Sequence, residues 1–169
     1  MARILFIIAP KDFRDEEYFE PKEVLEAHGH DCLTASVAES CVGKLGAIVM
    51  VDLLVKEVKL DDIDVLVLIG GPGAPTLAKY PEVMKLIKAA KLAQKKIAAI
   101  CIAPTLLAQA GVIEGKEVTV FSTAESRKII KEVGKAIFLD KPVVVDGTLV
   151  TANGPAAARE FGEKIAALL

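Results

Sequence analysis

Residues Ile97 to Pro104 read IAAICIAP, and this stretch decides how the rest of the chain is interpreted. The apolar run from Ile97 to Ile100 suits a strand that is buried on both faces, as strands of parallel sheets are. Cys101 ends the run, and a helical pattern extends from Pro104 to Ala110. The stretch therefore predicts a buried strand, a turn that carries a cysteine, and a helix.

The same alternation extends over the whole chain. Further apolar runs bounded by Gly, Pro or charged residues cover Ile4 to Ala9, Val65 to Ile69 and Val143 to Val145. Further helical patterns cover Glu16 to Ala27, Pro81 to Ala93, Thr123 to Glu132 and Ala156 to Leu168. Alternating strands and helices predict an α/β fold with a doubly wound, mostly parallel sheet and helices on both faces. No linker or repeat interrupts the pattern, so residues 1–169 are expected to form one domain.

Three local features refine this prediction. Ser122 with Glu125 three residues later is the pattern of a capping box at a helix start. The segment from Gly46 to Val58 alternates like a strand, and Val143 to Thr151 contains the hairpin turn pair Asp146-Gly147. We expect both segments to be short antiparallel additions at a sheet edge.

Composition excludes several classes of partner. The 169 residues are 53% hydrophobic and 26% charged, and 21 basic residues against 23 acidic ones give a net charge of -2. No basic excess is available for nucleic acid. The uncharged stretch from Ile97 to Ile113 is shorter than the ~20 apolar residues of a membrane span. Charged residues follow the first apolar run without a cleavage site, so no signal peptide is predicted and we expect a cytoplasmic location.

The three cysteines are too few for a disulfide scaffold, and a reducing cytosol keeps thiols free. One exception stays open. The chain has a single Asn and two Gln, a scarcity that is typical of heat-adapted proteins, some of which carry cytosolic disulfides. A bridge between Cys32 and Cys41 is the pairing to consider.

Chemistry-bearing residues follow three of the predicted strands. In an open α/β sheet, ligands bind at the carboxyl ends of the strands. The acidic residues Asp12, Asp15, Glu16 and Glu17 follow the first strand, Gly70 to Gly73 follows the next, and Cys101 follows the third. We therefore expect a carboxylate, a glycine loop and a thiol at one edge of the sheet.

Cys101 has two interpretations. At a helix N-terminus, the helix dipole and unpaired N–H groups favour the thiolate, which makes the thiol reactive. A small apolar thiol also packs well at a strand end without any reactivity. The acidic residues are open to two interpretations as well, since Asp15, Glu16 and Glu17 stabilise a helix N-terminus whatever their chemistry.

A histidine partner for Cys101 is not expected. The only two histidines, His28 and His30, lie at the far end of the first helix, about 16 Å from the carboxyl edge. Together with Cys32 they do not match a common zinc pattern, so no metal site is predicted.

Glu17 is then the best placed proton-transfer group. A desolvated glutamate beside a thiol has a raised pKa and can exchange a proton near neutral pH. The backbone N–H groups of Gly71 and Ile102 are candidate donors to an oxyanion. Pro72 has no N–H and cannot contribute.

At this point the chain resembles the ThiJ/PfpI family over nearly its whole length. The landmarks are Glu17-Tyr18-Phe19-Glu20-Pro21, Leu68-Ile69-Gly70-Gly71, Ala99-Ile100-Cys101-Ile102-Ala103-Pro104 and Thr151-Ala152-Asn153-Gly154-Pro155. The resemblance implies a flavodoxin-like fold and a nucleophile elbow at Cys101, with Glu17 bonded to its sulfur. It also implies an oxyanion hole from Gly71 and Ile102, and a substrate pocket that includes Gly70, Phe121, Asn153, Gly154 and Pro155. Members of the family are commonly dimers or larger rings, so a homo-oligomer is expected.

Two departures from the family pattern bear on function. Peptidase-like members carry His directly after the nucleophile, where this chain has Ile102. Deglycase-like members often carry His in the following strand, where this chain has Val120-Phe121. The absence of both histidines weakens the peptidase hypothesis most and the hypothesis of an enzyme acting on aldehydes moderately.

The leading hypothesis is an enzyme without cofactors that acts on 2-oxoaldehydes or on glycated proteins, as a glyoxalase or deglycase. Cys101 is its nucleophile, and Glu17 is its proton shuttle. One alternative is a redox-sensing or chaperone-like stress protein that works through oxidation of Cys101. Another is a peptidase or hydrolase that needs a group from a neighbouring subunit. A flavin-binding or phospho-acceptor domain is the remaining possibility.

Overall fold

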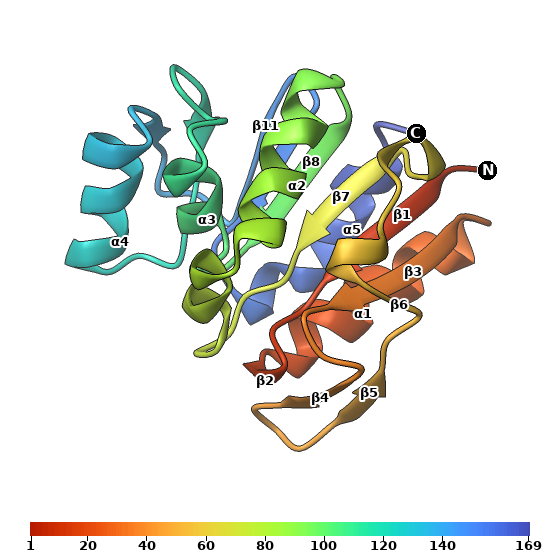
Figure 1. The fold of residues 1–169 in the computed structure, drawn as a ribbon. Helices are drawn as coiled ribbons and strands as arrows, with labels where there is room; N and C mark the ends of the chain where they lie inside the picture. The colour runs from red at the N-terminus through yellow and green to blue at the C-terminus, as the bar shows by residue number, and fades with distance from the viewer.

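The computed structural model describes residues 1–169 and contains one large sheet with helices on both faces (Figure 1). Its seven strands lie in the order β11-β12-β8-β7-β1-β3-β6. Their bounds are β1 Arg3–Ile7, β3 Asp31–Ser36, β6 Leu53–Leu54, β7 Val65–Leu68, β8 Lys96–Ile100, β11 Val143–Asp146 and β12 Leu149–Ala152. All neighbours are parallel except β11 and β12. The predicted mostly parallel α/β fold is therefore confirmed.

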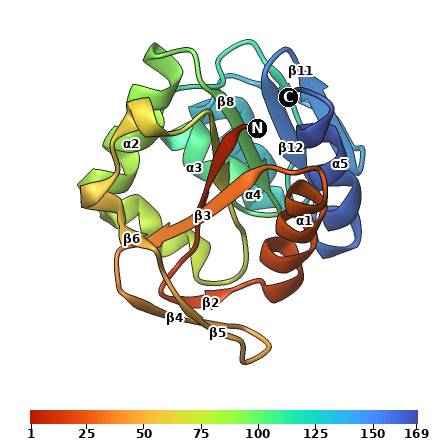
Figure 2. The same cartoon turned by 90° about the vertical axis from the view of Figure 1, so that its right-hand side faces the viewer.

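Five α-helices cover the sheet. They are α1 Asp15–Ala27, α2 Pro81–Leu92, α3 Pro104–Gln109, α4 Ala124–Lys128 and α5 Ala158–Ala166. Helices α1 and α5 pack against each other on one face, and α2 and α3 lie on the opposite face (Figure 2). Short helical turns are η1 Val55–Glu57, η2 Leu60–Asp62, η3 Ala74–Lys79, η4 Ile129–Val133 and η5 Pro155–Ala157. No helix combines the length and apolar character that crossing a bilayer requires.

The central strands are buried on both faces, which explains their uninterrupted apolar sequences. All residues from Ile4 to Ala9 and from Val65 to Ile69 are at most 1% exposed. Strand β3 was not predicted as a buried run because it mixes Thr34 and Ser36 with apolar residues. Hydrogen bonds satisfy both hydroxyls, since Thr34 bonds Tyr18 and Ser36 donates to the Ile8 carbonyl.

The predicted hairpin over Val143 to Thr151 is confirmed, and one detail of the prediction is wrong. Strand β11 is an antiparallel edge strand rather than a buried parallel strand, because it pairs only with β12. Val144 is buried, whereas Val145 is 41% exposed.

The segment from Gly46 to Val58 departs further from its prediction. Strand β5 (Ile48–Met50) pairs antiparallel with β4 (Ser40–Gly43), but in a separate sheet that also contains β2 (Lys11–Phe13). Strand β6 is parallel to β3 at the edge of the main sheet. Asp52 causes the division, because its backbone N–H and its carboxylate both bond the backbone of Thr34 and so hold the chain beside β3.

The start of α4 is also different from the prediction. The cap is Thr123 with Ser126, which exchange reciprocal hydrogen bonds of 2.9 and 3.0 Å, and not Ser122 with Glu125. After α4 the helix widens into the π-helical turn η4. A further two-stranded sheet, β9 (Glu117–Val118) with β10 (Ile137–Phe138), lies next to these elements.

Candidate active site

The candidate active site lies where the sheet changes its winding direction. Strand β1 has β3 on one side and β7 on the other, so the chain winds outward from it in both directions. Glu17 lies on the helix after β1, Gly70 and Gly71 follow β7, and Cys101 follows β8. This is the position at which doubly wound α/β proteins bind ligands.

Cys101 has the backbone conformation of a sharp turn. Its φ angle is 65°, in the left-handed region that non-glycine residues rarely adopt. Its N–H donates to the Ala152 carbonyl at 2.8 Å, and its own carbonyl accepts from the Phe121 N–H at 2.7 Å. These two bonds, from β12 and from the loop before α4, hold the strained turn in place.

Glu17 lies directly beside this turn and is fully buried in α1. Gly70 makes the approach possible. A Cβ at Gly70 would lie 2.6 Å from a Glu17 carboxyl oxygen and 2.7 Å from the Cys101 Cβ. Only a residue without a side chain fits between them.

Burial dominates the protonation of the pair. It raises the pKa of Glu17 to about 7, although the neighbouring Cys101 thiol and Gly70 N–H act in the opposite direction. Neither Glu17 oxygen has a hydrogen-bond partner of good geometry that would stabilise the carboxylate further. With a pKa of about 7, the Glu17 carboxyl group changes its protonation state near neutral pH.

Burial and the Glu17 charge raise the pKa of Cys101 to about 12. The backbone N–H groups of Gly71 and Ile102 act in the opposite direction and lower the pKa, but by less. This differs from the expectation that the helix N-terminus favours the thiolate. Helix α3 has only six residues and begins at Pro104, whereas the thiol is almost completely buried.

Gly71 and Ile102 have a second property in common. Neither backbone N–H donates to a carbonyl elsewhere in the chain. Both N–H groups therefore remain available as donors for an oxygen bound to the reacting carbon. Gly71 has a φ of 107°, and a Cβ there would collide with the backbone of Asp12 and Arg14.

A cleft of about 390 Å³ opens above the thiol. Its walls are formed by Arg14, Glu17, Gly71, Pro72, Pro75, Cys101, Ile102, Phe121, Thr123, Glu125 and Pro155. The volume suits a small-molecule ligand. No group of three or more His, Cys, Asp or Glu side chains is arranged to hold a metal ion.

The cleft contains only some of the residues predicted for the pocket. Phe121 and Pro155 line it, but Gly70, Asn153 and Gly154 do not. Gly70 lies between Cys101 and Glu17. Gly154 is buried, and a Cβ on this residue would lie 3.8 Å from the Phe121 ring. Asn153 donates its backbone N–H to Pro142, next to the β11–β12 hairpin.

The remaining candidate residues lie elsewhere. His28 bonds the Val24 carbonyl at the end of α1 and approaches Glu163 of α5, and His30 accepts from the Ala2 N–H. Cys32 and Cys41 are free thiols on β3 and β4, so the disulfide that the sequence left open is not formed.

Sequence reasoning missed five residues of the cleft, which are Arg14, Pro72, Pro75, Thr123 and Glu125. Arg14 lies within the acidic cluster and Pro72 lies within the glycine loop, so the sequence did indicate that both residues are near the site. Thr123 and Glu125 reach the cleft through the loop that precedes α4, whose path no local pattern indicated.

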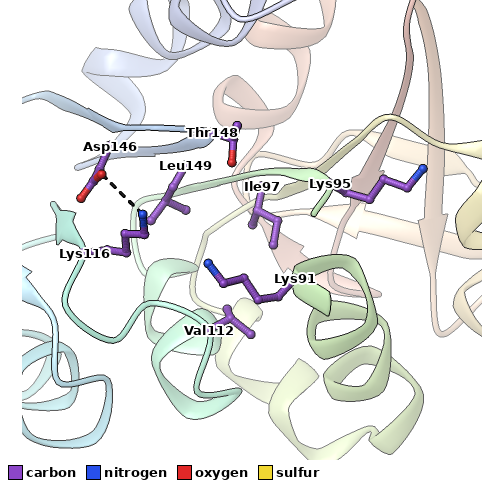
Figure 3. A pocket seen from close by; sticks show the side chains of 8 residues that line it. All are labelled: Lys91, Lys95, Ile97, Val112, Lys116, Asp146, Thr148 and Leu149. Atoms are coloured by element: carbon purple, nitrogen blue, oxygen red, sulfur yellow. Dashed lines mark ion pairs between the residues drawn. The ribbon is translucent and has the colours of Figure 1, made fainter. Parts of the chain in front are cut away.

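A second cavity lies at the opposite end of the sheet (Figure 3). Lys91, Lys95 and Lys116 surround it near the start of β8, and Lys116 pairs with Asp146 at 3.6 Å. Its volume is about 30 Å³, room for little more than one water molecule. Of these two cavities, only the cleft above Cys101 has room for a substrate.

The fold and the site define a class of α/β proteins in which a cysteine lies on a sharp turn between a strand and a helix, at the carboxyl edge of the sheet. The chain belongs to the DJ-1/PfpI family, whose sequence model matches residues 2–168. The resemblance to the ThiJ/PfpI family is thus confirmed.

Relatives with names that state an activity align over almost the whole chain. Deglycase TK1284 of Thermococcus kodakarensis is 35% identical, over 93% of this chain and 96% of its own. Glutathione-independent glyoxalase DJR-1.2 of Caenorhabditis elegans is 32% identical, over 95% of this chain and 85% of its own. Among solved structures, a ThiJ/PfpI domain protein from Brachyspira murdochii superposes with a TM-score of 0.92 at 31% identity, covering 98% of this chain and 95% of its own.

Proposed function

We propose that this protein is a cysteine enzyme that needs no cofactor and converts 2-oxoaldehydes, or their adducts on proteins, to 2-hydroxy acids. The observation that carries the proposal is the close approach of Glu17 to Cys101, beside the backbone N–H groups of Gly71 and Ile102, which donate to no carbonyl. The relatives named as a deglycase and a glyoxalase support the same reaction class.

The first step is addition of the thiol to the aldehyde. The Cys101 sulfur forms a bond to the aldehyde carbon, Glu17 takes the thiol proton, and the aldehyde oxygen receives that proton to give a hemithioacetal. The N–H groups of Gly71 and Ile102 stabilise the charge that develops on this oxygen. A carboxylate is required in this step because the thiol, with a pKa of about 12, does not ionise alone near neutral pH.

The second step is an internal transfer of hydrogen. Glu17 removes the proton from the former aldehyde carbon and returns it to the neighbouring oxo carbon, while the hydroxyl proton on the first carbon passes to the oxygen of the second. The first carbon is oxidised and the second is reduced, so no external oxidant is required. The product is a thioester, and water hydrolyses it to the 2-hydroxy acid and the free thiol.

The two alternatives have less support. Oxidation of Cys101 in a redox sensor would use the same thiol, but the relatives whose names state an activity are a deglycase and a glyoxalase. A peptidase needs a base to activate the thiol and an acid for the leaving amine, and Ile102 occupies the position of the histidine that peptidase-like members use.

The test is conversion of methylglyoxal to lactate with metals removed. We expect Cys101→Ala and Glu17→Gln each to lose activity by at least ~100-fold, as removal of a nucleophile or proton carrier does. Cys32→Ala is the matched control, since this thiol lies on β3 away from the cleft and its loss should leave the rate unchanged. Equal rates for Cys101→Ala and the unmodified protein contradict the proposal.

A further inference from the structure

Arg14 is the only cationic side chain in the walls of the cleft. Glu17 and Glu125 are the only other charged residues there. Arg14 precedes α1, and its backbone N–H donates to the Gly70 carbonyl at 3.0 Å, which fixes its main chain to the loop that approaches Cys101. The Arg14 backbone is therefore anchored beside the glycine loop of the site.

The guanidinium is held in one orientation. Its Nε donates to one Glu16 carboxyl oxygen at 2.8 Å and an Nη donates to the other at 3.2 Å, as a two-pronged ion pair. Such pairs have a defined geometry. Because Glu16 is only about one third exposed, the pair also limits the movement of the arginine side chain.

This ion pair leaves part of the guanidinium unused. Arginine has five N–H donors, and Glu16 engages two of them. No other side chain or carbonyl accepts a hydrogen bond from the Arg14 guanidinium in the structure. The remaining edge is a planar fork that matches a carboxylate and belongs to a residue of the cleft wall.

We propose that Arg14 is a specificity-determining residue, and that the preferred substrates are 2-oxoaldehydes that carry a carboxylate at the end remote from the aldehyde. The proposal rests on the proposed function for the reaction, and adds the chemical class of the substrate. Glu125 lies on the wall of the same cleft and repels an anion, so it directs the carboxylate toward Arg14.

The test compares a neutral and an anionic substrate of the same reaction. Methylglyoxal is the neutral one, and 4,5-dioxopentanoate, which gives 2-hydroxyglutarate, is the anionic one. We expect the protein to prefer the anionic substrate in kcat/KM. Arg14→Gln should lower the ratio of the two kcat/KM values by about 10- to 100-fold, the usual consequence of removing a charged hydrogen-bond partner.

Two further variants sharpen the result. Arg14→Lys keeps the charge without the fork and should recover part of the preference. Arg127→Gln is the matched control, because this arginine bonds Ser122 outside the cleft wall and its loss should leave the ratio unchanged. An equal fall for both substrates in Arg14→Gln overturns the proposal, since it means that Arg14 acts only on the Cys101 and Glu17 pair.

A binding measurement separates this proposal from the proposed function. Titration calorimetry of 2-hydroxyglutarate is carried out on Cys101→Ala, with and without Arg14→Gln. Binding that weakens at least about tenfold without Arg14 supports the carboxylate site even if neither aldehyde is turned over, a result that rejects only the proposed function. Equal binding in the two variants overturns the carboxylate site, whatever the turnover.

Discussion

Glu17 combines two properties that usually exclude each other, complete burial and an ionisable carboxyl group. Burying a charge without close partners destabilises the folded state. The same burial brings the pKa of this residue to about 7, where a proton carrier works best at neutral pH. If the proposed reaction is correct, Glu17 is a position at which stability is exchanged for activity.

This exchange predicts a pH-dependent gain in stability for Glu17→Gln. The folded protein holds the proton up to about pH 7, whereas the unfolded chain releases it near the ordinary value of 4.5. As pH rises between these values, the unfolded state is favoured and the free energy of unfolding falls, by about 3 kcal/mol in all. The variant lacks this loss and should be more stable by that amount at pH 8, with no difference near pH 4.

Urea unfolding at a series of pH values measures this effect. Glu23→Gln is the control, because it changes an exposed glutamate on the same helix. Stability curves of Glu17→Gln and the unmodified protein that run parallel from pH 4 to 8 contradict the explanation.

Strand-end reasoning placed Cys101, Glu17, Gly71 and Ile102 together because it depends only on the order of strands and on their direction. It did not anticipate the raised pKa of the thiol. That value depends on what covers Cys101, and the covering residues, such as Phe121 and Pro155, come from segments far along the chain.

At the scale of elements, α4 matters because its first turn holds one wall of the cleft. The Ser126 hydroxyl accepts from the Thr123 N–H and donates to the Phe121 carbonyl, so one side chain caps the helix and fixes the loop before it. The Phe121 N–H in turn bonds the Cys101 carbonyl. The helix cap is thus connected to the strained turn through two hydrogen bonds.

Ser126→Ala removes this connection. We expect a loss of about 1–2 kcal/mol in the free energy of unfolding, the usual effect of losing a cap and a buried hydrogen bond. The KM for methylglyoxal should rise more than kcat falls, because a cleft wall is loosened and the Cys101 and Glu17 pair is kept. Chemical unfolding and steady-state kinetics measure the two quantities.

Ser122→Ala is the control for this variant. Ser122 accepts only from Arg127 at the surface, so a change below about 0.5 kcal/mol is expected. If Ser122→Ala lowers the free energy of unfolding more than Ser126→Ala does, the cap is Ser122, as the sequence pattern suggested. That pattern was ambiguous because Ser122 and Thr123 are both good caps, and only the path of the loop selects between them.

At the scale of the whole molecule, the contact between α1 and α5 supports the helix that carries Glu17. Gly162 of α5 permits a close approach, since a Cβ there would lie 2.8 Å from the Pro21 Cα and 3.1 Å from the Val24 Cβ. The amphipathic pattern predicted α5, but not which helix it contacts, because a sequence pattern gives a face and not its partner.

Gly162→Ala should therefore destabilise the protein by about 1–3 kcal/mol, although alanine is the better helix former. Thermal unfolding measures the change, and Glu160→Ala on the exposed side of α5 is the control. If Gly162→Ala is as stable as the unmodified protein, α1 and α5 can move apart without loss of stability, and the close approach is not required.

The position of β12 has a consequence for biosynthesis. The Ala152 carbonyl that holds the Cys101 N–H belongs to a strand that leaves the ribosome well after β1, α1, β7 and β8. Because chains emerge from the N-terminus onward, a nascent chain exposes both Glu17 and Cys101 before the anchor exists. The turn at Cys101 is therefore completed late in translation, and a prematurely terminated chain lacks the bond that shapes it.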